Sequence, residues 1–233
     1  MSEPSAQIPA PSQRGFFITL EGGEGAGKST QMRHLVRNLR DAGIRAIGTR
    51  EPGGSAGAEV LRKVLLSGKL AHLGAAAEAI LFAAARIDHI DSTIKPALQA
   101  GTFVISDRFS DSTRAYQGAH GQLEPQFLRA LERVTVNDVR PDLTVILDLP
   151  AAEGLTRIAA RRYAGETPDR FERENLQFHE SLRTAFLSIA VAEPLRCVVI
   201  DATGPEEEVA RAIFEVVLKR FLTPMAGKQA GYG

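Results

Sequence analysis

One segment sets the architecture of this chain, a short apolar run that leads into a glycine-rich loop: Phe16-Phe17-Ile18-Thr19-Leu20-Glu21-Gly22-Gly23-Glu24-Gly25-Ala26-Gly27-Lys28-Ser29-Thr30. The residues after the loop keep helical spacing. Within the loop, Gly22, Gly27, Lys28 and Ser29 match the pattern G-x-x-x-x-G-K-[ST] of the phosphate-binding P-loop. Since the strand–loop–helix context of that motif is also present, the sequence predicts a nucleotide-binding α/β protein.

The spacing of the loop suits a bound phosphate. Four residues between the motif glycines let the backbone curl so that successive N–H groups point inward. The glycines adopt positive φ at little steric cost. Lys28 brings positive charge to the β- and γ-phosphates, the Ser29 hydroxyl is a ligand for Mg²⁺, and the following helix directs its N-terminal dipole at the anion. We therefore predict ATP contacts along the whole loop, that is, at Gly22, Gly23, Glu24, Gly25, Ala26, Gly27, Lys28, Ser29 and Thr30. A glycine turn without a ligand is the alternative.

The overall composition excludes several classes of protein. The chain has 233 residues, and its 28 basic and 28 acidic residues cancel, which argues against a general nucleic-acid coat or a polybasic membrane anchor. A single cysteine, Cys197, excludes an internal disulfide and fits a reducing compartment. No apolar run approaches the roughly 20 residues of a membrane span, and the N-terminus lacks the pattern of a signal peptide. We expect a soluble, cytoplasmic protein.

Strand-like and helical segments alternate along the chain. We expect a disordered tail over 1–14, a single domain over 15–222 and a flexible tail over 223–233. The predicted strands are 16–21, 44–49, 102–106, 143–147 and 196–200. The predicted helices are 29–42, 59–66, 74–100, 110–117, 124–137, 152–192 and 205–221. Because the strands are continuous apolar runs, the pattern predicts a parallel sheet of about five strands with helices on both faces.

Polar residues gather where the predicted strands end. They are Glu21, Arg50-Glu51, Asp107-Arg108, Asp148 and Asp201. In a parallel sheet, ligands bind beyond the carboxyl ends of the strands. We therefore expect these groups to converge in one cleft.

Four further motifs narrow the class of protein. In chain order they are Thr49-Arg50-Glu51-Pro52-Gly53-Gly54, Phe82-Ala83-Ala84-Ala85-Arg86, Ser106-Asp107-Arg108-Phe109 and Ala115-Tyr116-Gln117-Gly118. Together with the P-loop they resemble the thymidylate kinase family over residues 15–221. The resemblance implies a P-loop kinase that transfers the γ-phosphoryl group of ATP to dTMP, with ATP and Mg²⁺ bound, and a homodimer.

The resemblance also implies an acceptor site. Phe82 and Arg86 lie four residues apart, hence on one helix face, and the family uses this pair for the thymine ring. Glu24 would accept a hydrogen bond from the 3′-hydroxyl of the deoxyribose. The other implied dTMP ligands are Arg50, Glu51, Arg108, Ser112, Tyr116 and Gln117. From the residues alone, Phe82 as ordinary core and Glu24 as a solvent-facing loop residue stay open.

An arginine-rich segment, about 157–170, is the candidate lid. Its arginines are Arg157, Arg161, Arg162 and Arg170. Arginine above a transferring phosphoryl group neutralises the charge on its oxygens, and Arg161 is our first choice for this role. A solvated basic helix face is the alternative. Gly25 stands where some family members carry a catalytic arginine, which resembles the bacterial-type enzymes whose lid supplies the arginines.

Two aspartates end apolar strands, so either could hold hydrated Mg²⁺. We prefer Asp107, with Ser29 as the second ligand, because the neighbouring Arg108 suits the acceptor phosphate. Asp148 is interpreted as a cap of the following helix. The predicted catalytic set is Lys28, Asp107, Arg108 and Arg161. The five histidines show no metal spacing and are interpreted as surface or packing residues.

Two other functions stay open at this stage. A deoxynucleoside kinase would phosphorylate a sugar hydroxyl and would need a carboxylate base, for which Asp107 or Glu51 is available. A P-loop regulatory ATPase would signal to a partner and would have no nucleotide acceptor. The chain lacks the Asn-Lys-x-Asp motif of GTPases, and a switch gives no reason for the pairing of Phe82 with Arg86.

Overall fold

The structure is a computed structural model that describes residues 14–163 and 170–222. Most of the two predicted tails, and residues 164–169 of the predicted lid, lie outside the described residues. Within the described ranges, the search for a helix long and apolar enough to cross a bilayer finds none.

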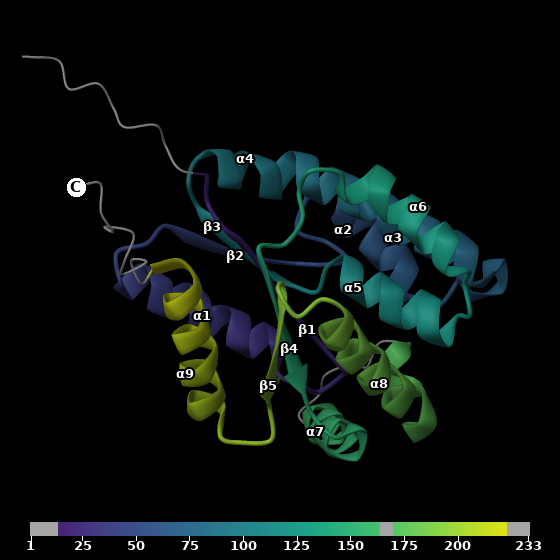
Figure 1. The fold of residues 1–233 in the computed structure, drawn as a ribbon. Coiled ribbons are helices and arrows are strands. Elements are labelled where there is room, and N and C mark those ends of the chain that lie inside the picture. The colour runs from purple at the N-terminus through teal and green to yellow at the C-terminus, as the bar shows by residue number, and fades with distance from the viewer. Residues whose placement is uncertain (1–13, 164–169, 223–233) are drawn as a thin grey trace, which may run out of the picture.

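The five predicted strands form one parallel sheet (Figure 1). They are β1 (Phe17–Gly22), β2 (Ala46–Arg50), β3 (Phe103–Asp107), β4 (Leu143–Asp148) and β5 (Cys197–Asp201), in the spatial order β2-β3-β1-β4-β5. The central strand β1 and its neighbour β3 are buried along their whole length, as their continuous apolar sequences predict. Leu20 of β1 is paired with Asp107 of β3 and Val145 of β4, so β3 ends two residues before β1 and three residues before β4.

Helices cover both faces of the sheet, which confirms the predicted fold class. One face carries α1 (Lys28–Asp41) and α9 (Glu206–Val217). The other carries α4 (Lys95–Gln99), α5 (Ser110–Thr113) and α8 (Leu176–Ala192). Three helices form an outer group in which α3 contacts both partners: α2 (Ala56–Leu66), α3 (Gly74–His89) and α6 (Pro125–Val136). Short helical turns complete the described chain: η1 (Ala71–Leu73), η2 (Ile90–Ile94), η3 (Arg114–His120), η4 (Phe171–Arg173) and η5 (Leu218–Leu222).

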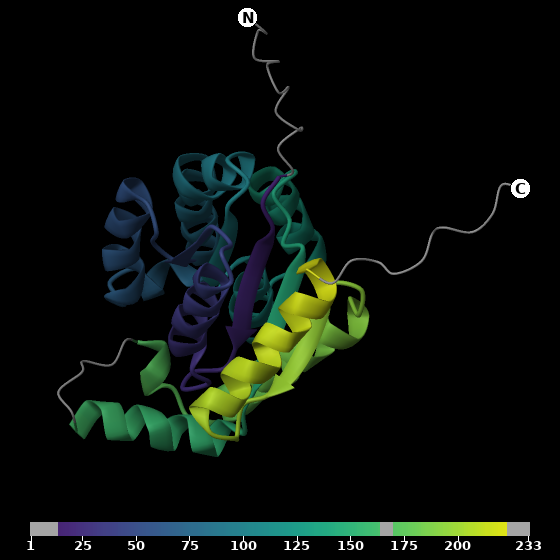
Figure 2. The ribbon, with the colours of Figure 1, turned by 90° about the vertical axis from the view of Figure 1, so that its left-hand side faces the viewer.

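The remaining helix, α7 (Ala151–Tyr163), lies across the carboxyl end of the sheet, next to the turn that follows β1 (Figure 2). A Cβ atom added to Gly154 of α7 would stand 2.4 Å from the Glu24 carbonyl oxygen in the P-loop. Since the first half of the predicted lid is this helix, its base packs directly on the phosphate loop.

The strand β1 supplies both halves of the core. Alternate residues of a strand point to opposite faces. Ile18 and Leu20 pack with Leu35 and Leu39 of α1 on one side. Phe17 packs with Phe109 on the other, edge-to-face at 4.8 Å between ring centroids.

The long helix predicted over 74–100 is interrupted. It consists of α3, the wider π-type turn η2 and α4. Pro96 lies in the first turn of α4, and proline has no N–H for the ladder of the preceding turn. Cys197 is buried at the start of β5, and burial raises the pKa of its thiol to about 11.

Candidate active site

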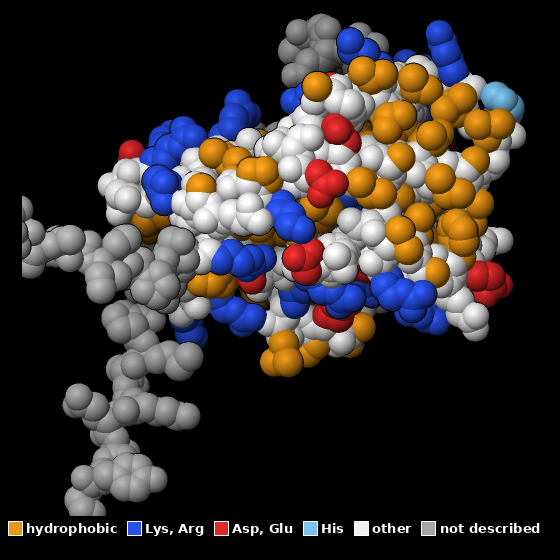
Figure 3. Space-filling view, turned by 90° about the horizontal axis from the view of Figure 1, so that it is seen from above, with side chains coloured by type: hydrophobic (Ala, Val, Ile, Leu, Met, Phe, Trp, Pro, Cys, Tyr) orange, Lys and Arg blue, Asp and Glu red, His pale blue; other side chains and the backbone are white. Residues whose placement is uncertain are grey.

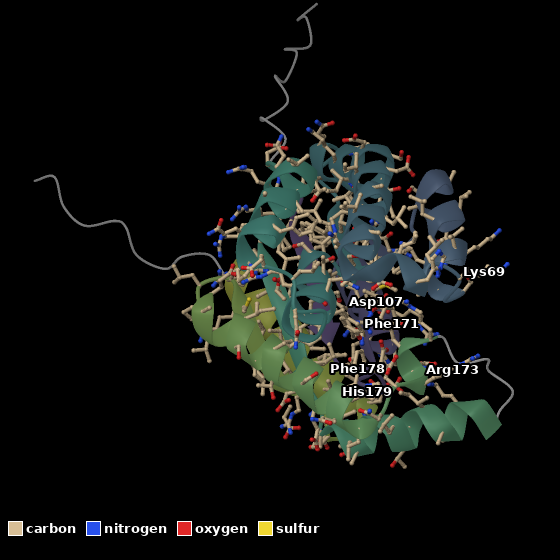
Figure 4. All side chains as sticks on the ribbon, turned by 90° about the vertical axis from the view of Figure 1, so that its right-hand side faces the viewer. Lys69, Asp107, Phe171, Arg173, Phe178 and His179 are labelled. Atoms are coloured by element: carbon tan, nitrogen blue, oxygen red, sulfur yellow. The ribbon has the colours of Figure 1, made fainter. Side chains whose placement is uncertain are left out.

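A cleft of about 570 Å³ opens at the carboxyl ends of β1, β2 and β3. Its walls come from the P-loop, α3, η3, α7 and the loop between β5 and α9. Asp107 at the end of β3 and Phe171 of η4 are far apart in the sequence, yet both line this cleft (Figure 4). The predicted site residues on its wall are Glu24, Gly25, Ala26, Gly27, Lys28, Ser29, Thr30, Arg50, Glu51, Phe82, Arg86, Asp107, Arg108, Ser112, Tyr116, Gln117, Arg157 and Arg161.

Gly27 and Gly25 of the P-loop are required for different reasons. Gly27 has φ 87° at the start of α1, a conformation that glycine adopts without a Cβ clash. Gly25 has φ 75°, and a Cβ atom there would stand 2.4 Å from the Gly154 carbonyl oxygen of α7. Gly23 does not have a positive φ, so the backbone freedom expected of it is not used.

Lys28 lies inside the curl of this loop. Its Nζ donates to the carbonyl oxygens of Gly22 at 3.1 Å and Gly23 at 2.6 Å. Burial, together with the nearby charge of Arg108, lowers the pKa of Lys28. Gly22 and Gly23 are not on the cleft wall but hold the ammonium group from behind.

Ser29 and Asp107 meet at the floor of the cleft, where the Ser29 hydroxyl donates to Asp107 Oδ2. A hydroxyl and a carboxylate oxygen in contact are hard ligands of the type Mg²⁺ prefers, and Mg²⁺ keeps several waters besides. The donor set therefore fits a hydrated magnesium ion.

Asp148 neither lines the cleft, where it could hold Mg²⁺, nor caps the helix that follows it. Its two carboxylate oxygens accept from Arg183 of α8, at 2.6 Å from Nε and 2.9 Å from Nη2. The first turn of α7 is instead closed by the Pro150 carbonyl oxygen, which accepts from the N–H groups of Glu153 and Gly154. The interpretation of Asp148 as a helix cap is therefore wrong, because a bidentate arginine from a distant helix occupies it.

Arg108 is aimed into the cleft by an unusual backbone. Its φ of 70° lies in the left-handed region, which costs a non-glycine residue about 1–3 kcal/mol. The surrounding structure holds this conformation, because the Arg108 carbonyl oxygen accepts from the Ser106 hydroxyl at 2.7 Å and the Phe109 N–H donates to Glu21 Oε1 at 2.7 Å.

Glu24 is the partner of Arg108. Arg108 Nη2 donates to Glu24 Oε1 at 2.6 Å, and the Tyr116 hydroxyl donates to the same oxygen at 2.7 Å. Burial favours the neutral acid, but the charges of Arg108 and Lys28 outweigh it and lower the pKa of Glu24 to about 2. The side chain is only 12% exposed, so the alternative of a solvent-facing Glu24 is excluded.

Phe82 and Arg86 lie on the same face of α3 and both line the cleft, so Phe82 is not ordinary core. Arg86 is deeply buried and its guanidinium is held on two edges. Nε donates to Glu51 Oε2 at 2.8 Å, and Nη2 donates to the Phe109 carbonyl oxygen at 3.2 Å and to Thr113 Oγ1 at 3.1 Å. Within the described part of the chain, its Nη1 has no hydrogen-bond partner.

Three other residues predicted to bind dTMP line the cleft, and the polar group of each is hydrogen-bonded to a glutamate of the protein. Gln117 Nε2 donates to Glu78 Oε2 at 2.9 Å. Arg50 Nη2 donates to Glu59 Oε1 at 2.9 Å. Ser112 Oγ donates to Glu21 at 2.7 Å. They are therefore preorganised by neighbours that the sequence analysis did not identify.

The predicted lid arginines divide into two groups. Arg157 and Arg161 line the cleft, where Arg157 is held by Glu153 at 2.6 Å and Arg161 by Glu172 at 2.8 Å. Arg170 instead pairs with Glu78 and lies over the Phe171 ring, outside the cleft wall. The side chain of Arg162 lies outside the described residues.

The expected convergence of all strand-end polar groups is wrong for three of them. Glu21 is completely buried beneath the cleft, and burial, with the nearby charge of Asp111, raises its pKa to about 8. Asp148 is bound by Arg183, and Asp201 accepts from Thr203 at 2.8 Å. A polar residue at the end of a predicted strand therefore lies at the carboxyl end of the sheet. The sequence does not show whether its side chain lines the cleft.

Histidines also take roles that their spacing does not reveal. His89 and His179 are buried, as a packing role predicts. Figure 4 shows His179 beside Phe178 on α8, and their rings meet edge-to-face at 5.2 Å between centroids. His34 Nε2 lies 2.6 Å from Glu206 Oε1 at the start of α9. Its Nδ1 accepts from Arg37 at 2.7 Å, so His34 joins α1 to α9.

Comparisons of the sequence and of the structure with known proteins identify the family of this chain. The family model described as thymidylate kinase matches residues 20–213. A thymidylate kinase of Nitrobacter winogradskyi is 56% identical over 95% of this chain and 96% of its own length. A thymidylate kinase of Bradyrhizobium sp. strain ORS 278 is 54% identical over 91% and 94%. The crystal structure of thymidylate kinase from Ehrlichia chaffeensis superposes with a TM-score of 0.70 at 30% identity, over 88% of this chain and 99% of that one. Since the model match and the relatives span nearly the whole described domain, this chain belongs to the thymidylate kinase family.

Proposed function

We propose that this cleft catalyses the ATP-dependent phosphorylation of dTMP to dTDP. The observation that carries the proposal is that one cleft contains both a P-loop and the paired Phe82 and Arg86. A nucleotide bound by its phosphates at the loop and a second one bound by its base at α3 would meet phosphate to phosphate beside Arg108.

The donor half of the cleft is the P-loop. Its N–H groups and Lys28 would hold the β- and γ-phosphates of ATP. On binding, the ammonium of Lys28 would exchange the carbonyl oxygens of Gly22 and Gly23 for phosphate oxygens. Ser29 and Asp107 would hold a hydrated Mg²⁺, which when bound neutralises phosphate charge.

The acceptor half selects a thymine nucleotide. Phe82 would stack on the base, and the open Nη1 of Arg86 would donate to a base carbonyl oxygen. Tyr116, packed over the sugar, would leave no room for a 2′-hydroxyl, and Glu24 would accept from the 3′-hydroxyl. Gln117 would face the base edge, while Arg50 and Arg108 would bind the 5′-phosphate with bidentate geometry.

The reaction requires little covalent chemistry from the protein. An oxygen of the acceptor phosphate, already ionised at neutral pH, forms a bond to the γ-phosphorus as the bond to the β–γ bridging oxygen breaks, and ADP leaves. Lys28, Arg108 and Arg161 would stabilise the charge that spreads over the transferring group. Segment 157–170 would close over this group and exclude water.

The test is a coupled assay that measures ADP release with ATP and a panel of acceptors. We expect rapid turnover with dTMP, slow turnover with dUMP and none with dCMP or dAMP. Rapid turnover with thymidine in place of dTMP would identify a deoxynucleoside kinase. Hydrolysis that is independent of any acceptor would identify a regulatory ATPase.

The proposal includes a homodimer. Helices α2, α3 and α6 present exposed apolar side chains on neighbouring surfaces: Val60, Val64, Ile80, Ile87 and Val134. Figure 3 shows a broad field of hydrophobic side chains on this side of the molecule. An apolar surface shared by three helices is typical of a self-complementary interface.

Sedimentation at micromolar concentration tests this interface. Ile80→Asp places a charge at its centre and should yield monomers. Val191→Asp alters an even more exposed valine, on α8, and should leave the assembly unchanged. Monomers of the unaltered protein, or equal behaviour of the two variants, would contradict the dimer.

The proposal places the enzyme in the cytoplasm. The lone Cys197 is a free, buried thiol whose pKa burial raises to about 11, so it has no disulfide to maintain in an oxidising compartment. Separation of cell fractions, followed by the dTMP kinase assay on each, tests the location.

A further inference from the structure

Behind the cleft wall, Arg86 is the end of a buried chain of hydrogen bonds that runs through Glu51 and His89 to Thr49. Arg86 Nε donates to Glu51 Oε2 at 2.8 Å. Glu51 Oε1 lies 3.1 Å from His89 Nδ1, and His89 Nε2 lies 2.7 Å from Thr49 Oγ1. The side chain of His89 is 0% exposed, so it cannot touch a ligand in the cleft.

The chemistry of the partners assigns the protons in this chain. An ionised carboxylate only accepts hydrogen bonds, so His89 must donate from Nδ1 to Glu51. In the neutral imidazole Nε2 is then an acceptor, and the Thr49 hydroxyl donates to it. His89 thus fixes the second oxygen of the carboxylate whose first oxygen fixes Arg86.

The backbone next to the histidine leaves it little room to turn. A Cβ atom on Gly54 would stand 2.4 Å from His89 Nε2 and 2.4 Å from Thr49 Oγ1, so the loop after β2 closes directly over the link. Neighbouring Asp88 holds the same loop from α3, since its carboxylate accepts from Ser55 Oγ at 2.6 Å. The imidazole is therefore held in one orientation between α3 and the end of β2.

Removing one hydrogen-bond partner from a buried charged group leaves that group partly unsatisfied, which is unfavourable. Glu51 needs a donor on its second oxygen to remain in the plane that Arg86 requires. A rotation of this carboxylate would release Nε of Arg86 and move Nη1, the open donor on the cleft side.

We infer that His89 is a positioning residue for base recognition, acting through Glu51 on Arg86. This inference rests on the proposed dTMP site. It assigns His89 a role in acceptor affinity and none in the binding of ATP.

Two replacements of similar size separate the two ring nitrogens. In His89→Asn the amide nitrogen lies at the same number of bonds from Cα as Nδ1, so a donor to Glu51 is kept. In His89→Gln the amide lies where Nε2 was, so the contact with Thr49 is kept and the donor to Glu51 is lost. We expect His89→Gln to raise the Kd for dTMP about tenfold, the effect of losing one hydrogen bond to a charged group. We expect His89→Asn to stay within about twofold of the unaltered protein, with the KM for ATP unchanged in both.

Several outcomes would overturn the inference. Equal dTMP affinity in the two variants would remove the role of Nδ1. A parallel change in ATP and dTMP constants would indicate a merely structural histidine. Thr49→Val and Thr49→Ser provide a second test if either histidine variant fails to fold, since the first should weaken dTMP binding and the second should restore it.

Arg86→Ala distinguishes this inference from the proposed function. Unchanged dTMP affinity in Arg86→Ala would remove the acceptor site itself. Weakened affinity in Arg86→Ala with equal affinity in His89→Gln and His89→Asn would remove only the role of His89. His72→Gln, which alters an exposed histidine of η1, is the control for histidine replacement.

Discussion

Replacing Glu24 by Gln should change how the stability of this protein depends on pH. Glu24 is 12% exposed and accepts from Arg108 Nη2 at 2.6 Å. The charges of Arg108 and Lys28 overcome the effect of burial and lower its pKa from 4.5 to about 2. Glutamine keeps the shape but removes the charge, so two buried cations lose their common counter-ion.

The magnitude follows from the pKa difference. Each pKa unit corresponds to about 1.4 kcal/mol, so ionised Glu24 adds roughly 3 kcal/mol to the free energy of unfolding at pH 7. Because the folded pKa is the lower one, this stabilisation is present above pH 4.5 and is lost as pH falls toward 2. The difference between the unaltered protein and Glu24→Gln should therefore shrink from about 3 kcal/mol at pH 7 to about 1 kcal/mol at pH 3.

Urea unfolding at a series of pH values from 7 to 3 measures this difference. The other carboxylates titrate in both proteins, so their contributions cancel in the difference. Glu215→Gln, which alters an exposed glutamate of α9, should differ little from the unaltered protein at any pH. A Glu24→Gln difference that stays constant between pH 7 and pH 3, or that is absent at pH 7, would refute the reasoning.

Three further variants address the cleft. Lys28→Ala should lower kcat roughly 100- to 1,000-fold with little change in unfolding, as expected when one donor to a developing negative charge is lost; near-normal turnover would contradict the role of the P-loop. Arg86→Ala should raise the Kd for dTMP about 10- to 100-fold and spare ATP, which calorimetric titration of each nucleotide measures. Gly154→Ala should lower the free energy of unfolding by about 1–3 kcal/mol, because its Cβ would stand 2.4 Å from the Glu24 carbonyl oxygen. Helix propensity alone predicts the opposite, a gain of about 1 kcal/mol, so stabilisation of Gly154→Ala in denaturant would disprove the contact.

The strands show where sequence reasoning succeeds. Continuous apolar runs such as 102–106 predicted buried parallel strands, and the observed bounds differ by at most two residues. The P-loop and the pair Phe82 and Arg86 were also predictable, because short-range spacing in a strand, turn or helix determines which residues share a face. All of these depend on residues close together in the chain.

The pairing of arginines with carboxylates shows where sequence reasoning fails. Arg183 binds Asp148 across 35 positions in the sequence, and Arg108 binds Glu24 across 84. Arg170 resembles the other lid arginines in sequence, yet it pairs with Glu78 on α3. Many arginines and many carboxylates are equally suitable partners until the fold brings particular ones within hydrogen-bond distance.

The amino-acid sequence by itself determined the P-loop, the order of strands and helices and many of the residues that line the cleft, since these follow from local periodicity and from backbone conformations that only certain residues adopt. The tertiary structure alone decided that Glu21 lies beneath the cleft, that Asp148 belongs to Arg183 and that His89 stands behind Arg86. The physical reason is that the pairing of buried charges depends on distances between segments far apart in the chain, and these distances exist only once the sheet and its helices have packed.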